Sequence, residues 1–136
     1  MILASIIRII HIMLILFILI APFSSYAPIL ILHLTGAWCL LVHWAANNDI
    51  CFLTLVESKL RNIDYRKGFL HKFVSPVYNI TDKKMSELCH IMVILSMLVA
   101  SYNLFESTSF DKARKCYMNN GSLIDCFKIL FDKRSF

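Results

Sequence analysis

The chain has 136 residues, of which 58% are hydrophobic and 17% are charged, and its net charge is +5. A soluble domain of this size has roughly a quarter of its residues charged, so the composition excludes an ordinary soluble domain. Only three glycines and three prolines occur, which suits a few long helices. The sequence therefore predicts an all-α, polytopic membrane protein with three transmembrane helices.

Three apolar runs are long enough to cross a hydrocarbon core of roughly 30 Å. They cover about residues 2–23, 28–46 and 85–105. The first run also resembles a secretory signal peptide, but Pro28 would follow the expected cleavage point, which favours a retained span. We expect residues 1–105 to form a transmembrane helical bundle and residues 106–136 to form a polar tail.

Within the first span, Arg8 and His11 lie one turn apart and share a helix face. Either Arg8 extends to the nearer interface, which we favour, or both side chains face inward and meet a carboxylate. In the second span, Gly36 and Ala37 are small enough to allow close helix packing. His33 is interpreted as a residue that hydrogen-bonds to another helix.

Residues 51–80 follow the second span and are predicted to be an interfacial segment. Residues 51–60 alternate apolar and polar residues with helical spacing but are too short to span, which indicates an amphipathic helix in the interface. In the tail, apolar residues recur at helical spacing between Leu123 and Phe131, so we expect a short amphipathic helix that docks on the membrane or on a partner.

The tail also holds a candidate disulfide, Cys116 with Cys126, which would form in an oxidising compartment. Asn120 begins the sequence Asn-Gly-Ser and is a candidate glycosylation site. The basic residues flank the apolar runs rather than lying in them. This placement indicates attraction to lipid and control of topology, so we predict a bilayer and no nucleic acid as partner. The positive-inside rule weakly favours a cytosolic N-terminus and central loop, with the tail on the far side.

Polar residues gather where the second span ends and the third begins, on what three antiparallel spans make the same side of the membrane. The candidate cluster consists of His43, Asn47, Asn48, Glu57, Glu87 and His90. The favoured interpretation is that these groups satisfy each other and anchor helix ends. The alternatives are a pore or proton path and a haem site. We identify no catalytic residue, metal site or cofactor, and Cys51 is interpreted as a neutral, buried thiol.

The pattern HW-x-x-NN-x-x-C-x-LT-x-x-E runs from His43 to Glu57. It resembles uncharacterised small multi-span membrane proteins of large eukaryotic DNA viruses and, more distantly, a bacterial family of short membrane proteins. The bacterial pattern has a proline where this chain has Leu55. The resemblance implies a bundle of three or four spans, located in the virion inner membrane or a host internal membrane. It brings no activity.

These observations predict a small, non-enzymatic integral membrane protein with a structural or assembly role. Other membrane or capsid proteins, or further copies of the chain, are the expected protein partners. A small oligomeric channel or proton-conducting protein is the first alternative, and a haem-binding redox protein is the second.

Overall fold

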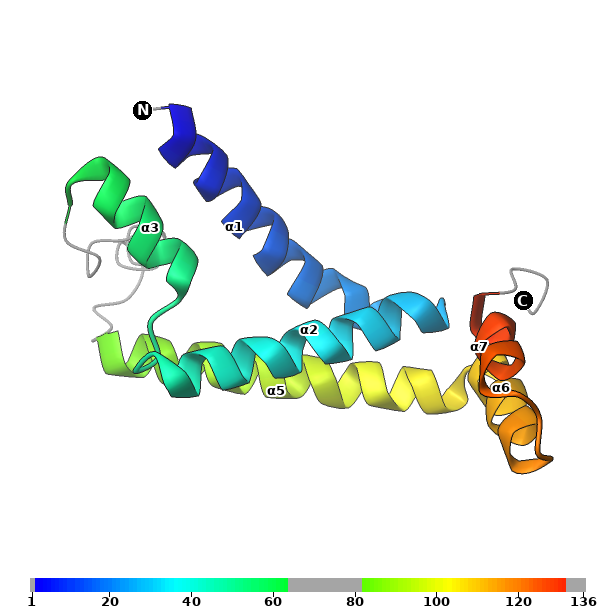
Figure 1. Cartoon of the computed structure of the whole chain (residues 1–136). Helices are drawn as coiled ribbons and strands as arrows, with labels where there is room; N and C mark the ends of the chain where they lie inside the picture. Colours follow the sequence, from blue (N-terminus) through cyan, green and yellow to red (C-terminus); the bar gives the residue numbers. More distant parts are fainter. Residues whose placement is uncertain (1, 64–81, 132–136) are drawn as a thin grey trace. The chain divides into compact units, whose positions relative to one another are not determined.

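The computed structural model describes residues 2–63 and 82–131, and the elements within these ranges are all helical (Figure 1). The part of the predicted interfacial segment beyond residue 63 lies outside the described residues. The α-helices are α1 (Ile2–Ile20), α2 (Ala27–Ala46), α3 (Phe52–Arg61), α5 (Asp82–Glu106), α6 (Thr108–Met118) and α7 (Leu123–Phe131). The prediction of an all-α fold is confirmed.

Three of the helices are long and apolar enough to cross a membrane. The apolar segments are Ile2–Phe23, Ala27–Ala46 and Lys83–Glu106, so the predicted spans are correct to within two residues at each end. Large apolar side chains remain exposed along them; Leu98, for example, is 61% exposed. Such a surface suits a lipid environment, where an apolar side chain needs no cover.

The short connection between α1 and α2 is built from residues that stop one helix and start the next. A 3₁₀ turn at Ala21–Phe23 carries Pro22, whose ring cannot continue the α-helical hydrogen bonding. The Pro22 carbonyl accepts a hydrogen bond of 2.8 Å from Asn103 Nδ2 of α5. Without this donor, the Pro22 carbonyl in the α1–α2 connection would lack a hydrogen bond in apolar surroundings.

The described chain divides into two compact units. The first contains Met1–Phe17 and Trp38–Ile94, and the second contains Ile18–Ala37 and Leu95–Phe136. In the first unit the end of α2 contacts the start of α5, and in the second the start of α2 contacts the end of α5. The two helices are therefore antiparallel neighbours, and the tail helices belong to the same compact unit as the end of α5.

Small residues form much of the core of the second unit. The buried cluster consists of Ala27, Leu30, Ala100, Leu104, Ala113 and Leu130. Because Ala27 and Ala100 are almost fully buried, the backbones of α2 and α5 can approach closely here. His33 is fully buried and its Nε2 lies 3.3 Å from Ser96 Oγ, which is the expected hydrogen bond between helices.

Gly36 has no part in this close packing. A Cβ atom placed on Gly36 meets nothing within 4 Å, so the expectation that it marks a close helix contact is wrong. Its neighbour Ala37 is fully buried and fulfils that role. The sequence could not separate the two, because adjacent residues of a helix point about 100° apart and no periodic signal assigned the inner face.

We expect Ala100→Leu to lower the stability of the protein by about 1–3 kcal/mol, because three further carbons must fit between closely packed helices. The control is Ala45→Leu in α2, where the side chain is exposed. Unfolding in detergent micelles by added SDS, followed by circular dichroism, measures both. Equal midpoints for the two variants would contradict the packing described here.

Candidate functional site

The connection from α2 to α3 is fixed by backbone geometry and by His43. Asn48 and Asp49 both adopt positive φ, 49° and 63°, a conformation that Asn and Asp tolerate better than most residues. His43, in the last turn of α2, accepts a 3.1 Å hydrogen bond at Nε2 from the backbone N–H of Phe52. Since Phe52 is the first residue of α3, the imidazole caps that helix.

Asn47 braces the same turn. Its Nδ2 donates to the carbonyl oxygen of His43 at 2.9 Å, which satisfies an acceptor at the end of α2. The backbone N–H of Asp49 donates to the Trp44 carbonyl at 2.9 Å and closes the helix end. The turn is therefore held by side chains that the sequence placed in one polar cluster.

His90 of α5 docks onto this turn. Its Nδ1 lies 2.9 Å from the Ser86 carbonyl oxygen, and its Nε2 lies 3.5 Å from Asp49 Oδ1. These contacts tie His90 both to its own helix and to the turn after α2. The Trp44 ring lies against His90 with the ring centroids 4.8 Å apart.

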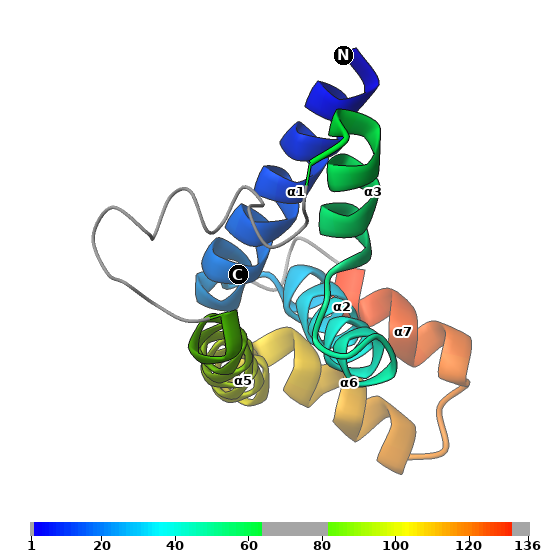
Figure 2. The same cartoon turned by 90° about the vertical axis from the view of Figure 1, so that its left-hand side faces the viewer.

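Glu57 of α3 faces α1 and is 4% exposed. Its Oε1 accepts a hydrogen bond of 2.8 Å from Arg8 Nε and lies 3.0 Å from Arg61 Nε. Figure 2 shows α3 alongside α1, as this contact requires. Arg8 therefore meets a carboxylate, as the alternative prediction expected, and its extension to the interface stays a prediction.

A second contact joins the same two helices. His11 of α1 is 6% exposed and hydrogen-bonds to the thiol of Cys51, the residue before α3. Burial raises the pKa of Cys51. The hydrogen bond and charge of His11, together with backbone N–H groups at the start of α3, lower it by a larger amount. The pKa of Cys51 therefore lies below its usual value, and the interpretation of Cys51 as a neutral thiol stays a prediction.

An open cavity of about 430 Å³ lies between the turn after α2 and the first turns of α5. Its lining residues are Asp49, Lys83, Ser86, Glu87, His90 and Ile91. The lining residues include both charged signs, but most of the surface that they expose to the cavity is apolar. The described residues contain no group of three or more metal-ligating side chains.

The six predicted cluster residues thus enter different contacts. His43 and Asn47 hold the α2–α3 turn, Asn48 shapes it, and Glu87 and His90 line the cavity. Glu57 binds arginines instead. Sequence reasoning missed Asp49 and the role of Arg61, although the run Asn-Asn-Asp after a helix is a signal for left-handed backbone.

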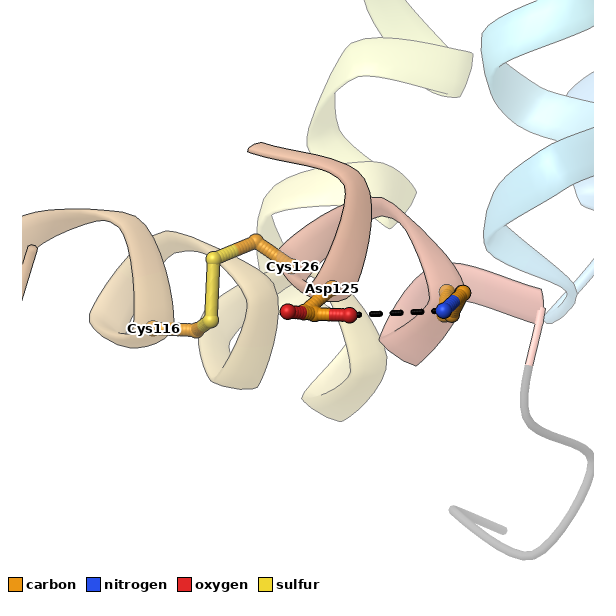
Figure 3. The surroundings of a disulfide bond; sticks show 4 residues. Cys116, Asp125 and Cys126 are labelled. Carbon is orange, nitrogen blue, oxygen red and sulfur yellow. Dashed lines mark hydrogen bonds and ion pairs between the residues drawn. A yellow bond between two sulfur atoms is a disulfide. The ribbon is translucent and has the colours of Figure 1, made fainter. Parts of the chain in front are cut away.

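In the second unit, α6 and α7 form a hairpin joined by the disulfide Cys116–Cys126 (Figure 3). A Cβ on Gly121 would lie 2.6 Å from Cys116 Sγ and 3.0 Å from Cys126 Sγ, so the turn needs glycine there. The candidate glycosylation residue Asn120 is exposed in this turn and has a positive φ of 60°. Glycosylation itself stays a prediction.

The hairpin presents different chemistry on its two helices. On α7, Cys126 and Leu130 are buried, while an apolar face stays exposed, consisting of Leu123, Ile124, Phe127 and Phe131. On α6, Lys112, Arg114 and Lys115 are exposed. Hydrogen bonds from Lys115 and, to a smaller extent, from Arg114 lower the pKa of Asp111. Its carboxylate therefore stays ionised and partly offsets the positive charge of α6. Sequence analysis did not predict α6, because its few apolar residues form no clear helical stripe.

Comparisons with protein-family models, curated proteins and solved structures found no match. Three of the described helices are long and apolar enough to cross a membrane. The protein is a small, multi-span, helical membrane protein.

We expect Glu57→Gln to destabilise the protein by about 2–4 kcal/mol, because it leaves two arginines without their buried counter-charge. Adding Arg8→Gln to this variant is expected to restore part of the loss, since one unpaired cation is then removed. SDS-induced unfolding of the two single variants and the double variant gives the coupling energy. A coupling energy near zero would show that the ion pair does not hold α3 to α1.

We expect Cys51 to react with iodoacetamide at lower pH than an ordinary thiol, because its lowered pKa gives more thiolate near neutrality. The rate should rise through a pH below the usual thiol range. His11→Phe should move the midpoint of the rate–pH profile upward. A background with Cys39→Ser and Cys89→Ser isolates the measurement, and an unchanged profile in His11→Phe would rule out the imidazole as cause.

Proposed function

We propose that this protein is a non-enzymatic structural or assembly component of the membrane that it spans. The observation that carries the proposal is the mutual pairing of the polar side chains around α3. Glu57 binds Arg8 and Arg61, and His43 caps the helix. Groups engaged in this way fix the ends and contacts of helices, whereas a catalytic or proton-carrying group needs to exchange partners during its cycle.

The α6–α7 hairpin supplies the contact surface that an assembly role requires. Only Ser107 separates α6 from the end of α5, so the hairpin is held next to the membrane surface. The exposed apolar face of α7, with Lys128 beside it, suits burial in the interface. The basic residues of α6 are then available to an acidic surface on a neighbouring assembly protein.

The resemblance of the His43–Glu57 pattern to small membrane proteins of large DNA viruses gives the proposal a location. In a virion inner membrane or a host internal membrane, the acidic partner would be a capsid or membrane protein, or a further copy of this chain. Detection of the protein in purified virions supports this location. Its restriction to other cellular membranes argues against it.

Charge reversal tests the contact surface. We expect Lys112→Glu combined with Arg114→Glu to reduce cross-linking of the membrane-embedded protein into larger species by about fivefold or more, because complementary charges then repel. Lys59→Glu in α3 is the matched control and should leave cross-linking unchanged. Equal cross-linking in the basic-surface variant and the wild type would overturn the proposed role of α6.

The cavity beside His90 favours a channel or proton path as second candidate, because it brings titratable groups together where a span begins. Proton flux into liposomes distinguishes it: a conducting protein shows flux that His90→Ala or Glu87→Gln reduces. A structural component shows none above empty liposomes. The haem alternative requires His43 or His90 to leave the partners described above, and a Soret band in the purified protein would support it.

A further inference from the structure

Cys51 lies between a membrane-spanning helix and an amphipathic one. It follows the turn after α2 and directly precedes α3. Its thiol is free and partly exposed, whereas the other free cysteines, Cys39 and Cys89, lie within α2 and α5. Cys51 is therefore the free thiol at the point where the chain leaves a span, and cysteines in such positions are the ones that acyl groups modify in membrane proteins.

The imidazole of His11 lies against this thiol and has room for a further proton. His11 is 6% exposed and hydrogen-bonds to Cys51. Its Nδ1 has no hydrogen-bond partner in the described part of the chain. Leaving a buried ring nitrogen without a partner costs stability, which a purely structural histidine avoids. The pair contains the two parts of an activated nucleophile, a thiol and an adjacent base.

The start of α3 favours the thiolate form of Cys51. The residue occupies the N-cap position with extended backbone, φ −68° and ψ 128°. The first N–H groups of the helix, which carry partial positive charge, lie beside this position. Although burial opposes them, His11 and these N–H groups hold the pKa of Cys51 below its usual value. More of the thiol is then ionised near neutrality, and the thiolate is the nucleophile.

The disulfide of the tail indicates which side of the membrane Cys51 faces. Cys116 and Cys126 are bonded in the hairpin after α5, as in proteins of an oxidising compartment. Asp49, in the turn before Cys51, contacts His90 near the start of α5. Because α5 spans the membrane, its start and the hairpin after its end are on opposite sides. Cys51 therefore faces the reducing side, where its thiol stays free.

We propose that Cys51 is a site of S-acylation, modified with a long-chain acyl group from a thioester donor such as acyl-coenzyme A, with His11 as the base. His11 takes the thiol proton while Cys51 Sγ attacks the carbonyl carbon of the thioester. A carbon–sulfur bond forms to Cys51, the carbon–sulfur bond to the donor breaks, and the departing thiolate receives the proton. The products are an acyl-cysteine and the free thiol of coenzyme A.

An acyl chain on Cys51 adds to the anchoring of α3. This helix has 10 residues, and three of them, Glu57, Lys59 and Arg61, are charged, so its apolar face is small. Phe52, the residue after Cys51, is 61% exposed and is available to enter the leaflet beside the chain. Each buried methylene of an acyl chain increases the affinity for the membrane. The site does not depend on the assembly role proposed above.

Acylation of the purified full chain tests the site. The protein in phospholipid vesicles is incubated with palmitoyl-coenzyme A, and mass spectrometry of its peptides follows the acyl groups that neutral hydroxylamine removes. We expect Cys51 to be acylated about tenfold faster than Cys39 or Cys89, because its thiol adjoins a base. Equal rates at the three cysteines, or no adduct at Cys51, would overturn the proposal.

Replacement of His11 separates the effect of the base from that of the position. His11→Gln keeps a polar side chain that cannot take the proton, so the rate of acylation at Cys51 should fall about tenfold. Cys89 in the same molecule is the internal control and should keep its rate. No loss at Cys51, or an equal loss at Cys89, would refute the role of His11.

Acyl exchange on the protein expressed in eukaryotic cells tests the modification with natural donors. Hydroxylamine releases the acyl groups, and a maleimide mass tag then marks each thiol that was acylated. We expect one tag on the wild-type chain and on Cys39→Ser, the matched control, and none on Cys51→Ser. A tag that persists in Cys51→Ser, or a wild-type chain without a tag, would exclude Cys51 as the acylated residue.

Discussion

The first compact unit depends on one carboxylate, that of Glu57, which pairs with two guanidinium groups. Arg8 lies within a helix that is otherwise suited to lipid, and a cation there is costly unless it is paired. Glu57 provides the pairing from α3, and Arg61 on the same helix completes the group. The helix after the second span is therefore held against α1 by this ion pair.

Other contacts of this unit follow from that arrangement. With α3 beside α1, Cys51 at its start meets His11, and the first N–H of the helix meets His43. The remaining residues of the turn are positioned to receive His90 from α5. Architecture and local chemistry are thus coupled: the contacts that orient α3 also lower the pKa of the Cys51 thiol, and an open cavity lies beside the turn.

Hydropathy was sufficient to locate the spans, because a run of about twenty apolar residues has few alternatives to a membrane helix. The amphipathic pattern of residues 51–60 likewise predicted α3. Side-chain contacts were harder to predict, because the depth of a residue along its helix does not show which neighbouring helix its side chain faces. Glu57 was grouped with the histidines at its depth. The sequence allowed Arg8 to meet a carboxylate but did not identify Glu57, 49 positions away, as that partner.

The separation of Arg8 from Glu57 has a consequence for biosynthesis. Arg8 leaves the ribosome long before Glu57, so the first helix enters the insertion machinery with an arginine whose counter-charge does not yet exist. Until α3 has been made, that helix is best kept near the interface or inside the translocon, where water reaches the guanidinium. Final placement of the first span would then be a late step, completed only when the third helix of the chain arrives.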